Sequence, residues 1–440
     1  MNYQEALAYI HGTYKFGSKL GLTNIKKLLK LLDHPEKTLK VIHVAGTNGK
    51  GSTCSMIQSV LTAAGFRVGL YTSPFIQRFN ERIRIGESNI PDKELVKLTE
   101  QIKQCIDMML EEGYQHPTEF EVVTAMALKY YQQQQVDFVI LEVGLGGRLD
   151  ATNVIEKPLL CVITPIDYDH MAYLGNTLEA IAGEKAGIIK NGIPVVTGFQ
   201  QQKALQVLKE KAASLQASFV HVMPEHLTIH STTLQGQTFT VLLRGRRYER
   251  LTVSLPGPHQ AENCMLALVA IQKLEELGHV TIEENLLRKG LEKTKWMGRL
   301  EIVHEKPLVI IDGAHNIQGA RSLSKSIALL LKDASITWVI GMLEDKEIGD
   351  VLDALLPQVQ RVVVTQPDYH RAVKAEDLGK IVQEKHTHVW VEPVISEAID
   401  RALEITPESG AVLCAGSLYM LGQIRSIFLG EEAGDDLCDK

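Results

Sequence analysis

The residues best suited to chemistry lie in a glycine-rich stretch, AGTNGKGS, at positions 45–52. An apolar segment, VIHVA, precedes it, and a helix-like run, STCSMIQSVLTAAG, follows it. Glycines there let successive backbone N–H groups face an anion, and a lysine adds positive charge for the outer phosphates of a nucleotide. The stretch departs from the usual phosphate-binding motif because Gly51 separates Lys50 from Ser52. We interpret it as a variant phosphate-binding loop, since the flanking strand and helix argue against a turn that is glycine-rich by chance.

Acidic and histidine side chains follow two later apolar segments. Glu142 stands near the end of DFVILEVG (137–144). Asp169 and His170 come just after LLCVITPID (159–167). Open α/β sheets build their sites at the carboxyl ends of parallel strands, so a metal or phosphate contact is favoured here, with Glu142 placed to hold Mg²⁺. Taken alone, each residue would also fit an ordinary strand-end acid or a surface histidine.

Two further segments carry residues whose role the pattern leaves open. GEKAGIIK supplies Lys185 and Lys190, which by themselves read as solvated lysines at a helix end. IIDGAHN (310–316) places Asp312 and His315 after another apolar strand. That arrangement resembles a nucleotide- or substrate-contacting loop, although helix caps often use Asp and Asn as well.

Alternating apolar runs predict the elements that position these side chains. We expect residues 1–40 to be helical. Continuous apolar runs are typical of strands buried on both faces of a parallel sheet. The sequence predicts strands at 41–45, 66–74, 137–144, 159–167 and 193–198, and helices at 52–65, 94–113 and 120–134.

The hydrophobic pattern changes after residue 200. FTVLLRGRRYERLTVSLPG predicts a hairpin, and QAENCMLALVAIQKLEELG predicts a helix. A second alternation of strands and helices then begins, with strands expected at 308–312, 337–343, 361–366, 388–393 and 411–416. We expect an α/β fold with two parts. A parallel-sheet domain that carries the P-loop (1–297) is followed by a Rossmann-like domain (298–440).

Composition narrows the possible functions. The 440 residues are 45% hydrophobic and 22% charged, typical of a globular protein with two or three domains. The net charge of −7 argues against a nucleic-acid partner. Six well-separated cysteines suggest neither a disulfide framework nor a zinc site. With no apolar run long enough to span a bilayer and no signal core, we expect a cytoplasmic, monomeric protein without a membrane partner.

Taken in order, the motifs make the whole chain resemble one family. HVAGTNGKGS, TSPFIQRFNERI, LEVGLGGRLDATN, the Asp169-His170 pair, EKAGIIK, LPGPHQAEN, WMGRLE, DGAHN and AGSLY are similar to those of the folylpolyglutamate synthase/dihydrofolate synthase family, within the Mur-type ligases. GTNGKGS is the loop that these ligases use in place of the common motif. The resemblance implies an ATP-dependent ligase that adds L-glutamate to the carboxylate of a folate. ATP would convert the carboxylate to an acyl phosphate, and the amine of glutamate would displace phosphate.

The resemblance also implies roles for individual residues. Lys50, Lys185 and His315 would be catalytic, with Lys185 carbamylated by CO₂. Two Mg²⁺ ions are implied, one held by Ser52 and Glu142 and the other by His170. Asn263 would contact the adenine side, and His315 and Ser417 would contact glutamate. The residues implied to bind ATP are Gly46, Thr47, Asn48, Gly49, Lys50, Gly51, Ser52, Asn263, Arg299 and Asp312.

Two loops are implied to bind the folate. TSPFIQRFNERI supplies Ser73, Phe75 and Arg82, with Phe75 standing where some relatives have histidine. GGRLDATN supplies Arg148 and Asp150, which resemble the pattern of enzymes that also make dihydrofolate from dihydropteroate. A loop salt bridge between these two residues is an equally open explanation. We expect both activities, with a folylpolyglutamate synthase of single activity as the alternative.

Two rival functions fit the sequence less well. A Mur ligase that extends a UDP-sugar peptide would carry a UDP-binding domain before the phosphate loop, and Gly46 leaves too little chain ahead of it. A GTP-dependent switch would need an Asn-Lys-x-Asp guanine motif, which the chain lacks. A second α/β domain would also have no role in such a switch.

Overall fold

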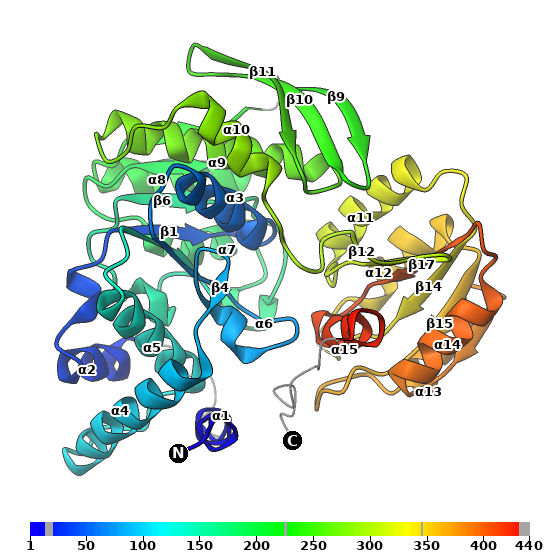
Figure 1. Ribbon diagram of the computed structural model, residues 1–440, viewed down its shortest axis with the longest axis horizontal. Helices are drawn as coiled ribbons and strands as arrows, with labels where there is room; N and C mark the ends of the chain where they lie inside the picture. Colours follow the sequence, from blue (N-terminus) through cyan, green and yellow to red (C-terminus); the bar gives the residue numbers. More distant parts are fainter. Residues whose placement is uncertain (14–20, 224–226, 345, 431–440) are drawn as a thin grey trace.

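The structure is a computed structural model that describes residues 1–13, 21–223, 227–344 and 346–430. Figure 1 shows two α/β bodies side by side, with an antiparallel ribbon rising from the first toward the second. The chain passes from one body to the other after α10. The predicted α/β class with parallel sheets is confirmed.

The first body is built on an eight-stranded sheet of order β4-β3-β2-β5-β1-β6-β7-β8. Six of its strands are parallel, and β3 and β4 add an antiparallel edge next to β2. Each strand predicted before residue 200 is present: β1 has the predicted bounds, and the other four are shorter than their apolar runs. The strands are β1 (Val41–Ala45), β2 (Val68–Tyr71), β3 (Ile83–Ile85), β4 (Ser88–Asn89), β5 (Phe138–Glu142), β6 (Leu160–Ile163), β7 (Val195–Thr197) and β8 (Phe219–His221).

Helices cover both faces of this sheet because neighbouring strand residues point to opposite sides. In β5, Phe138 and Ile140 pack with one set of helices, while Val139 and Leu141 pack with the other. The α-helices are α1 (Tyr3–His11), α2 (Thr23–Leu31), α3 (Lys50–Ala63), α4 (Asp92–Glu111), α5 (Glu119–Gln133), α6 (Met171–Leu174), α7 (Leu178–Lys185), α8 (Gln202–Ser214), α9 (Pro258–Glu276) and α10 (Glu284–Glu292). Short 3-10 turns are η2 (Pro35–Lys37), η3 (Phe79–Arg82), η4 (Ala151–Val154) and η5 (Ala186–Ile188).

The N-terminal segment holds two short helices rather than one helical stretch. Asn2 caps α1 by accepting a hydrogen bond from the backbone N–H of Glu5, and α2 begins only at Thr23. The expectation of helix over 1–40 is therefore wrong for the loops that follow α2, where Asp33 and His34 adopt positive φ angles. The part of that expectation at 14–20 lies outside the described residues.

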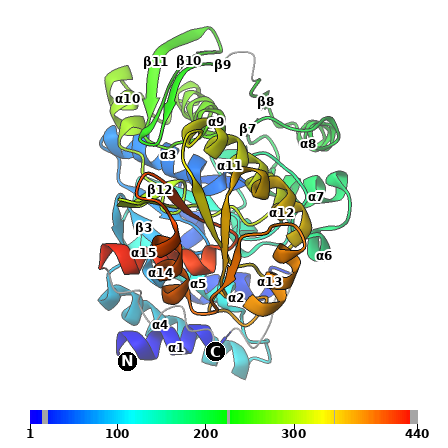
Figure 2. The same cartoon turned by 90° about the vertical axis from the view of Figure 1, so that its right-hand side faces the viewer.

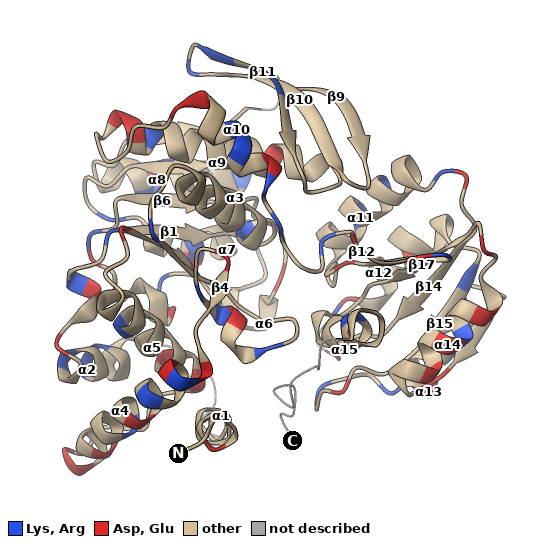
Figure 3. Cartoon of the chain, in the orientation of Figure 1, with Lys and Arg blue, Asp and Glu red and all other residues tan. Residues whose placement is uncertain are grey.

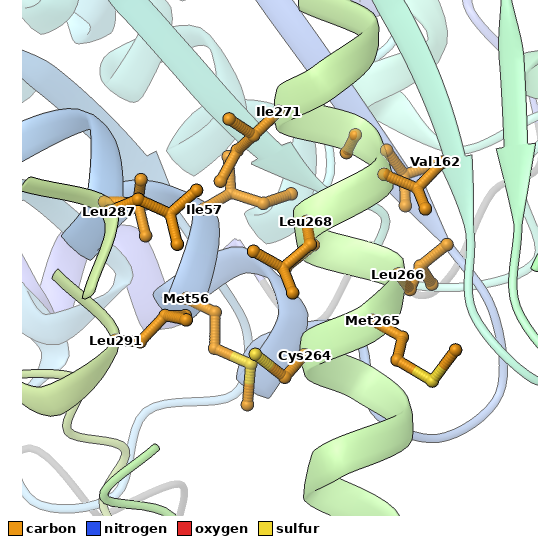
Figure 4. Close-up of a cluster of buried hydrophobic side chains, with 14 of the residues drawn as sticks. Met56, Ile57, Val162, Cys264, Met265, Leu266, Leu268, Ile271, Leu287 and Leu291 are labelled. Atoms are coloured by element: carbon orange, nitrogen blue, oxygen red, sulfur yellow. The ribbon is translucent and has the colours of Figure 1, made fainter. Parts of the chain in front are cut away.

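The core between α3, α9 and α10 fixes the helix that carries the phosphate loop. Figure 4 shows Ile57 of α3 pointing toward Leu268 and Ile271 of α9, and Met56 of α3 pointing toward Cys264 of α9. All of these side chains are fully buried. Truncating one of these side chains, such as Leu268, to alanine would cost about 2–5 kcal/mol, so the start of α3 is held firmly.

The predicted hairpin is part of a three-stranded antiparallel sheet of order β11-β10-β9. β10 (Gly236–Leu243) and β11 (Arg246–Val253) form the hairpin, and β9 (Leu227–Thr233) pairs with the other edge of β10. β9 was not predicted from the sequence, because most of its residues are polar or exposed. The predicted helix after the hairpin is α9.

The second body is a six-stranded sheet of order β12-β13-β17-β14-β15-β16. The five predicted strands are all present and parallel, whereas β12 is an antiparallel edge strand that its charged sequence, EIVHE, concealed. The elements are β12 (Glu301–Glu305), β13 (Leu308–Ile311), β14 (Ile336–Ile340), β15 (Arg361–Val364), β16 (Val389–Val391), β17 (Ala411–Cys414), α11 (Ile317–Leu330), α12 (Ile348–Leu355), η7 (Leu356–Gln358), α13 (Ala375–Gln383), α14 (Ile395–Ile405) and α15 (Leu418–Leu429).

Helices lie on both sides of the second sheet as well. Figure 2 shows α14 and α15 on one side and α11 and α12 on the other. Of the helices in the described part of the chain, none combines the length and the apolar character that crossing a membrane requires.

Candidate active site

A cleft of about 220 Å³ lies where loops from both sheets meet. The carboxyl ends of β1, β2, β5 and β6 open into it from the first sheet, and those of β14 and β17 from the second. This is where parallel α/β sheets bind ligands. Predicted residues that line the cleft are Gly46, Thr47, Asn48, Gly49, Lys50, Gly51, Ser73, Glu142, His170, Lys185, Arg299, His315 and Ser417.

The glycines of the phosphate loop are fixed by what packs against them. A Cβ on Gly49, whose φ is +82°, would collide with the Asn263 side chain. A Cβ on Gly51 would lie 2.5 Å from Cζ2 of Trp296. The glycine between Lys50 and Ser52 is thus required by an indole ring from the segment that leads to the second body.

The loop leaves the start of α3 open to an anion. Gly49 precedes α3 and offers no side chain to cap its first N–H groups, which is the arrangement that binds phosphate. The Lys50 ammonium donates to the Thr47 carbonyl at 3.0 Å, beside those groups. Ser52 is 2% exposed in the first turn of α3 and lies behind the lining, and Asn263 lies behind Gly49.

Glu142 brings a buried carboxylate to the cleft at the end of β5. Burial raises its pKa to about 6, although Lys50 and the backbone N–H of Ser73 oppose that rise. The Ser73 N–H donates to Oε2 at 3.2 Å. A buried acid of this kind is stabilised by a bound cation.

Lys185, at the end of α7, is buried rather than solvated. Its ammonium group donates to the Gly46 carbonyl at 2.8 Å. Burial, followed by the charge of Lys50, lowers its pKa to about 7. The solvated alternative is therefore wrong for Lys185, whose amine is neutral in a large fraction of molecules near neutral pH. Lys190 lies outside the cleft and donates to Asn153 Oδ1 at 2.7 Å.

Asp169 joins the two bodies across the cleft. Its carboxylate accepts from Lys346 Nζ at 3.2 Å and from Asn316 Nδ2 at 2.9 Å. Burial opposes its charge, but neighbouring cationic groups, above all His170 and Lys346, hold the Asp169 pKa well below its usual range. Asn48 of the phosphate loop donates from Nδ2 to Asn316 Oδ1 at 3.1 Å. Polar contacts between the two bodies therefore extend to the phosphate loop.

The second body adds the remaining predicted residues. Burial and the charge of Lys346 lower the His315 pKa to about 4, so the imidazole is neutral at physiological pH. Arg299 lines the cleft, and Ser417 caps α15 by accepting from the Tyr419 N–H at 3.3 Å. Asp312 lies behind the lining, and its carboxylate accepts from the loop N–H groups of Leu300 and Ala314. The helix cap in this loop is Asn316, which accepts from the Gly319 N–H at the start of α11.

The residues predicted to bind folate do not all line the cleft. Ser73 is in the cleft, whereas Phe75 and Arg82 are outside its lining, with the Arg82 guanidinium 5.3 Å from the Phe75 ring and 3.6 Å from Glu119. The folate contacts of these residues stay predictions.

Arg148 and Asp150 do not form the salt bridge considered above. Arg148 is 57% exposed and pairs with Glu184 at 2.9 Å. Asp150 is buried and accepts from the Leu145 N–H and from the N–H and hydroxyl of Thr152. Its carboxylate therefore holds the loop, and a pterin contact stays a prediction.

Several residues of the cleft were not predicted, and three of them make contacts that shape the site. Arg84 lines the cleft two residues beyond the predicted Arg82, Trp296 covers Gly51, and Lys346 binds Asp169. In a strand, residues two apart lie on the same face, so the NERIRIG segment could have indicated Arg84 as a second candidate beside Arg82. Nothing in the sequence pairs Trp296 with Gly51.

The donors in the cleft suit magnesium. Among the described residues no three His, Cys, Asp or Glu side chains gather as a ready-made metal site. Magnesium commonly uses one or two protein oxygens and completes its shell with phosphates and water. The buried carboxylate of Glu142 beside the phosphate loop fits that requirement.

Comparison with known proteins agrees with this arrangement. The Mur ligase middle domain matches residues 44–271, and the Mur ligase glutamate ligase domain matches residues 298–418. The dihydrofolate synthase/folylpolyglutamate synthase of Bacillus subtilis (strain 168) is 42% identical, over 96% of this chain and 98% of the relative. The folylpolyglutamate synthase of Lacticaseibacillus casei is 36% identical, over 98% and 99%.

The fold is also similar to that of a solved structure. Folylpolyglutamate synthase of Mycobacterium tuberculosis complexed with ADP superposes with a TM-score of 0.90 at 31% identity, covering 97% of this chain and 99% of that one. Sequence, domain order and fold therefore agree over nearly the full length. The chain belongs to the folylpolyglutamate synthase/dihydrofolate synthase family of Mur ligases.

Proposed function

We propose that this protein is an ATP-dependent ligase that joins L-glutamate to the carboxylate of folates and releases ADP and phosphate. The observation that carries the proposal is one cleft in which the phosphate loop, Glu142 and Lys185 face Arg299 and His315 of the second body. The names of the relatives and the nucleotide bound by the related structure support it.

The reaction has two steps. A carboxylate oxygen of the folate attacks the γ-phosphorus of ATP, so an O–P bond forms as the bond to ADP breaks. The amine of glutamate then attacks the acyl carbon, an amide bond forms, phosphate leaves and the nitrogen loses a proton. The Lys50 ammonium and the first N–H groups of α3 hold the transferring phosphate.

We propose that Ser52 and Glu142 hold one Mg²⁺ and that His170 holds a second. The ions would neutralise charge on the phosphate oxygens. In support, Glu142 is a buried carboxylate at the foot of the loop, Ser52 lies in the first turn of α3, and His170 lines the cleft.

We further propose that Lys185 carries a carbamate. A neutral lysine nitrogen attacks CO₂, a C–N bond forms and a proton is released, which turns a cation into an anion. The position of Lys185 supports this, because the cleft places its amine beside Lys50 and against the Gly46 carbonyl.

Contacts to the other substrates are also part of the proposal. His315 and Ser417 would bind glutamate, with Arg299 reaching ATP or glutamate. Asp312 would position Arg299 through the segment between them, since its carboxylate holds the Leu300 N–H. Ser73, Phe75, Arg82 and the Arg148 loop would form the folate side.

We propose that the enzyme also makes dihydrofolate from dihydropteroate, because the relative with 42% identity carries both names. Single activity remains the competing proposal, since the relative with 36% identity is named for folylpolyglutamate synthesis alone. We retain the domain boundary at 297/298, a monomeric state and a cytoplasmic location as proposals.

Purified protein with ATP, Mg²⁺ and glutamate tests the function directly. Either tetrahydrofolate or dihydropteroate is added, and ADP and product mass are followed. We expect ADP formation that depends on the acceptor and a mass gain of one glutamyl residue. Turnover with tetrahydrofolate alone would refute the second activity, and turnover with neither would refute the proposed function.

A further inference from the structure

A second, larger cavity of about 1330 Å³ adjoins the cleft. It lies between the outer face of α3, the β3–β4 edge, the end of α10 and α15. Gln77 and Arg425 stand on its two walls and are hydrogen bonded to each other. Both bodies of the molecule thus contribute to it, and we call it the basic groove.

Positive side chains dominate the lining of the basic groove. Among the described residues of its lining, the carboxylates are Glu81 and Glu87 alone, and the Glu81 carboxylate accepts from the backbone N–H groups of 76, 77 and 78. Figure 3 shows Lys and Arg positions in blue at the end of α10 and along the segment after it. The cations are Arg78, Arg84, Lys289, Lys293, Lys295 and Arg425.

Some of these cations already have partners and others do not. Arg78 pairs with Asp92, and Arg425 pairs with Glu301. Among the described residues, no carboxylate lies within ion-pair distance of Lys289, Lys293 or Lys295. In a chain with a net charge of −7, three adjacent uncompensated lysines point to an anionic ligand.

Arg84 stands where the basic groove meets the cleft. It lines both cavities, together with Glu81 and Met297. Its guanidinium lies 4.9 Å from the Trp296 ring, and its buried Nε has no hydrogen-bond partner. Buried guanidinium N–H groups are normally hydrogen bonded, so Arg84 keeps hydrogen-bonding capacity for an anion at the junction of the two cavities.

The remaining lining suits a chain of amides better than a pterin ring. Gln58 and Thr62 of α3 supply an amide and a hydroxyl group, whereas the Ser55 and Ser59 hydroxyls already donate to the carbonyls of Lys295 and Gly290. Tyr3 is the single aromatic side chain among the described residues of the lining, so there is little surface for stacking. An oligo-γ-glutamate presents amide groups along its backbone and one free carboxylate on each residue.

We propose that the basic groove binds the γ-glutamyl chain of folates that already carry several glutamates. The inference rests on the proposed function, because that reaction both consumes and produces such a chain. Arg84 receives the carboxylate nearest the reacting end, and Lys289, Lys293 and Lys295 receive those farther along. The groove therefore favours long-chain substrates over the monoglutamate.

The test compares tetrahydrofolates with one and with four γ-linked glutamates. In the triple variant Lys289→Gln/Lys293→Gln/Lys295→Gln, we expect the kcat/KM ratio of the long to the short substrate to fall roughly tenfold, as three exposed ionic contacts imply. A triple Lys→Arg variant should keep the wild-type ratio. The matched control, Lys203→Gln/Lys209→Gln/Lys211→Gln on α8, removes the same charge outside both cavities and should leave the ratio unchanged.

A binding experiment separates the groove from catalysis. Titration calorimetry with free tetra-γ-glutamate, without folate or ATP, should show binding to the wild type, and none to the glutamine triple variant. Raising the salt from about 50 mM to about 500 mM should weaken it. If the wild type and the glutamine triple variant have the same kcat/KM ratio and bind tetra-γ-glutamate equally well, the proposed role of the basic groove is wrong. Turnover of the monoglutamate in that case would still support the ligase function. No turnover of either substrate would refute the ligase, and the inference with it.

Discussion

The two walls of the cleft are built in different ways. On the side of the first sheet, charged groups are buried within one body, as in Glu142, 4% exposed, and Lys185, 5% exposed. On the side of the second sheet, contacts depend on side chains that reach across. Lys346 binds Asp169, and Asn316 binds both Asp169 and Asn48.

This difference suggests that the first wall serves the chemical step and that the second wall serves closure of the cleft. The first wall keeps its electrostatic arrangement within one packed sheet, so changes there should remove the chemical step. The second wall positions glutamate and shuts out water only when the bodies meet, so changes there should weaken substrate binding first. The following predictions test that division, from the largest expected effect to the smallest.

Lys50→Ala should give the largest loss. Removing the ammonium takes away a preorganised contact to the transferring phosphate, and kcat should fall by about 10²–10³-fold. ADP release measures the effect, and circular dichroism checks the fold. Lys190→Ala is the control, because Lys190 lies outside the cleft. A kcat within a fewfold of wild type would mean that the loop does not carry the chemistry.

Loss of Lys185 should come next. Lys185→Ala should lower kcat by roughly 10²-fold, because the anionic carbamate beside the loop is lost. A small carboxylate such as acetate in the buffer should restore part of the activity. Wild-type protein under ¹³CO₂ should show a carbamate resonance that the variant lacks. If the two ¹³C spectra match, Lys185 is not the carbamylated residue.

The contact between Gly51 and Trp296 predicts a steric effect. Gly51→Ala should destabilise the protein by about 1–3 kcal/mol and weaken ATP binding, because the new Cβ meets the indole ring at 2.5 Å. Thermal unfolding and nucleotide titration measure both changes. Gly183→Ala is the matched control, since a Cβ there meets nothing within 4 Å in a helix. An unchanged ATP affinity in the first variant would show that the loop tolerates a side chain.

On the other wall, Lys346→Gln should act mainly on binding. It removes the pair with Asp169, whose side chain is 12% exposed, and about 1–3 kcal/mol is typical for a hydrogen bond to a charged group. We expect KM for glutamate to rise about fivefold to tenfold, with a smaller change in kcat. A larger loss in kcat than in KM would place this wall in the chemical step and break the comparison.

Arg148→Gln should have the smallest effect. The side chain is exposed and tied only to Glu184 among the contacts of the described residues. We expect roughly a threefold drop in turnover of dihydropteroate, with little change for tetrahydrofolate, as for loss of a weak exposed contact. If the variant turns over each substrate at the same rate as the wild type, Arg148 does not contact the pterin.

The sequence predicted the first wall better than the second. Glycine spacing between an apolar strand and a helix identified the loop, and strand-end placement identified Glu142. Lys185 needed the family resemblance, because its burial depends on how α7 packs against the loop. The predicted Asp312 proved to lie behind the lining, where its carboxylate holds the N–H groups of Leu300 and Ala314.

Contacts made across long sequence separations escaped prediction. Trp296 packs on Gly51 from the far end of the first body, and Lys346 binds Asp169 only because the two bodies meet. No local sequence pattern indicates either contact. Arg82 and Arg84 illustrate a finer limit. They stand two residues apart, yet one pairs with Glu119 and the other faces the cleft, because Arg82 ends a 3-10 turn before the strand begins.

The central claim is that this cleft activates a carboxylate by phosphorylating it. Tetrahydrofolate labelled with ¹⁸O in its γ-carboxylate tests this directly, with ATP, Mg²⁺ and glutamate and mass analysis of the phosphate released. An acyl phosphate passes one carboxylate oxygen to phosphate, so we expect one ¹⁸O in each phosphate formed by ligation. Amide product accompanied by unlabelled phosphate would contradict the account.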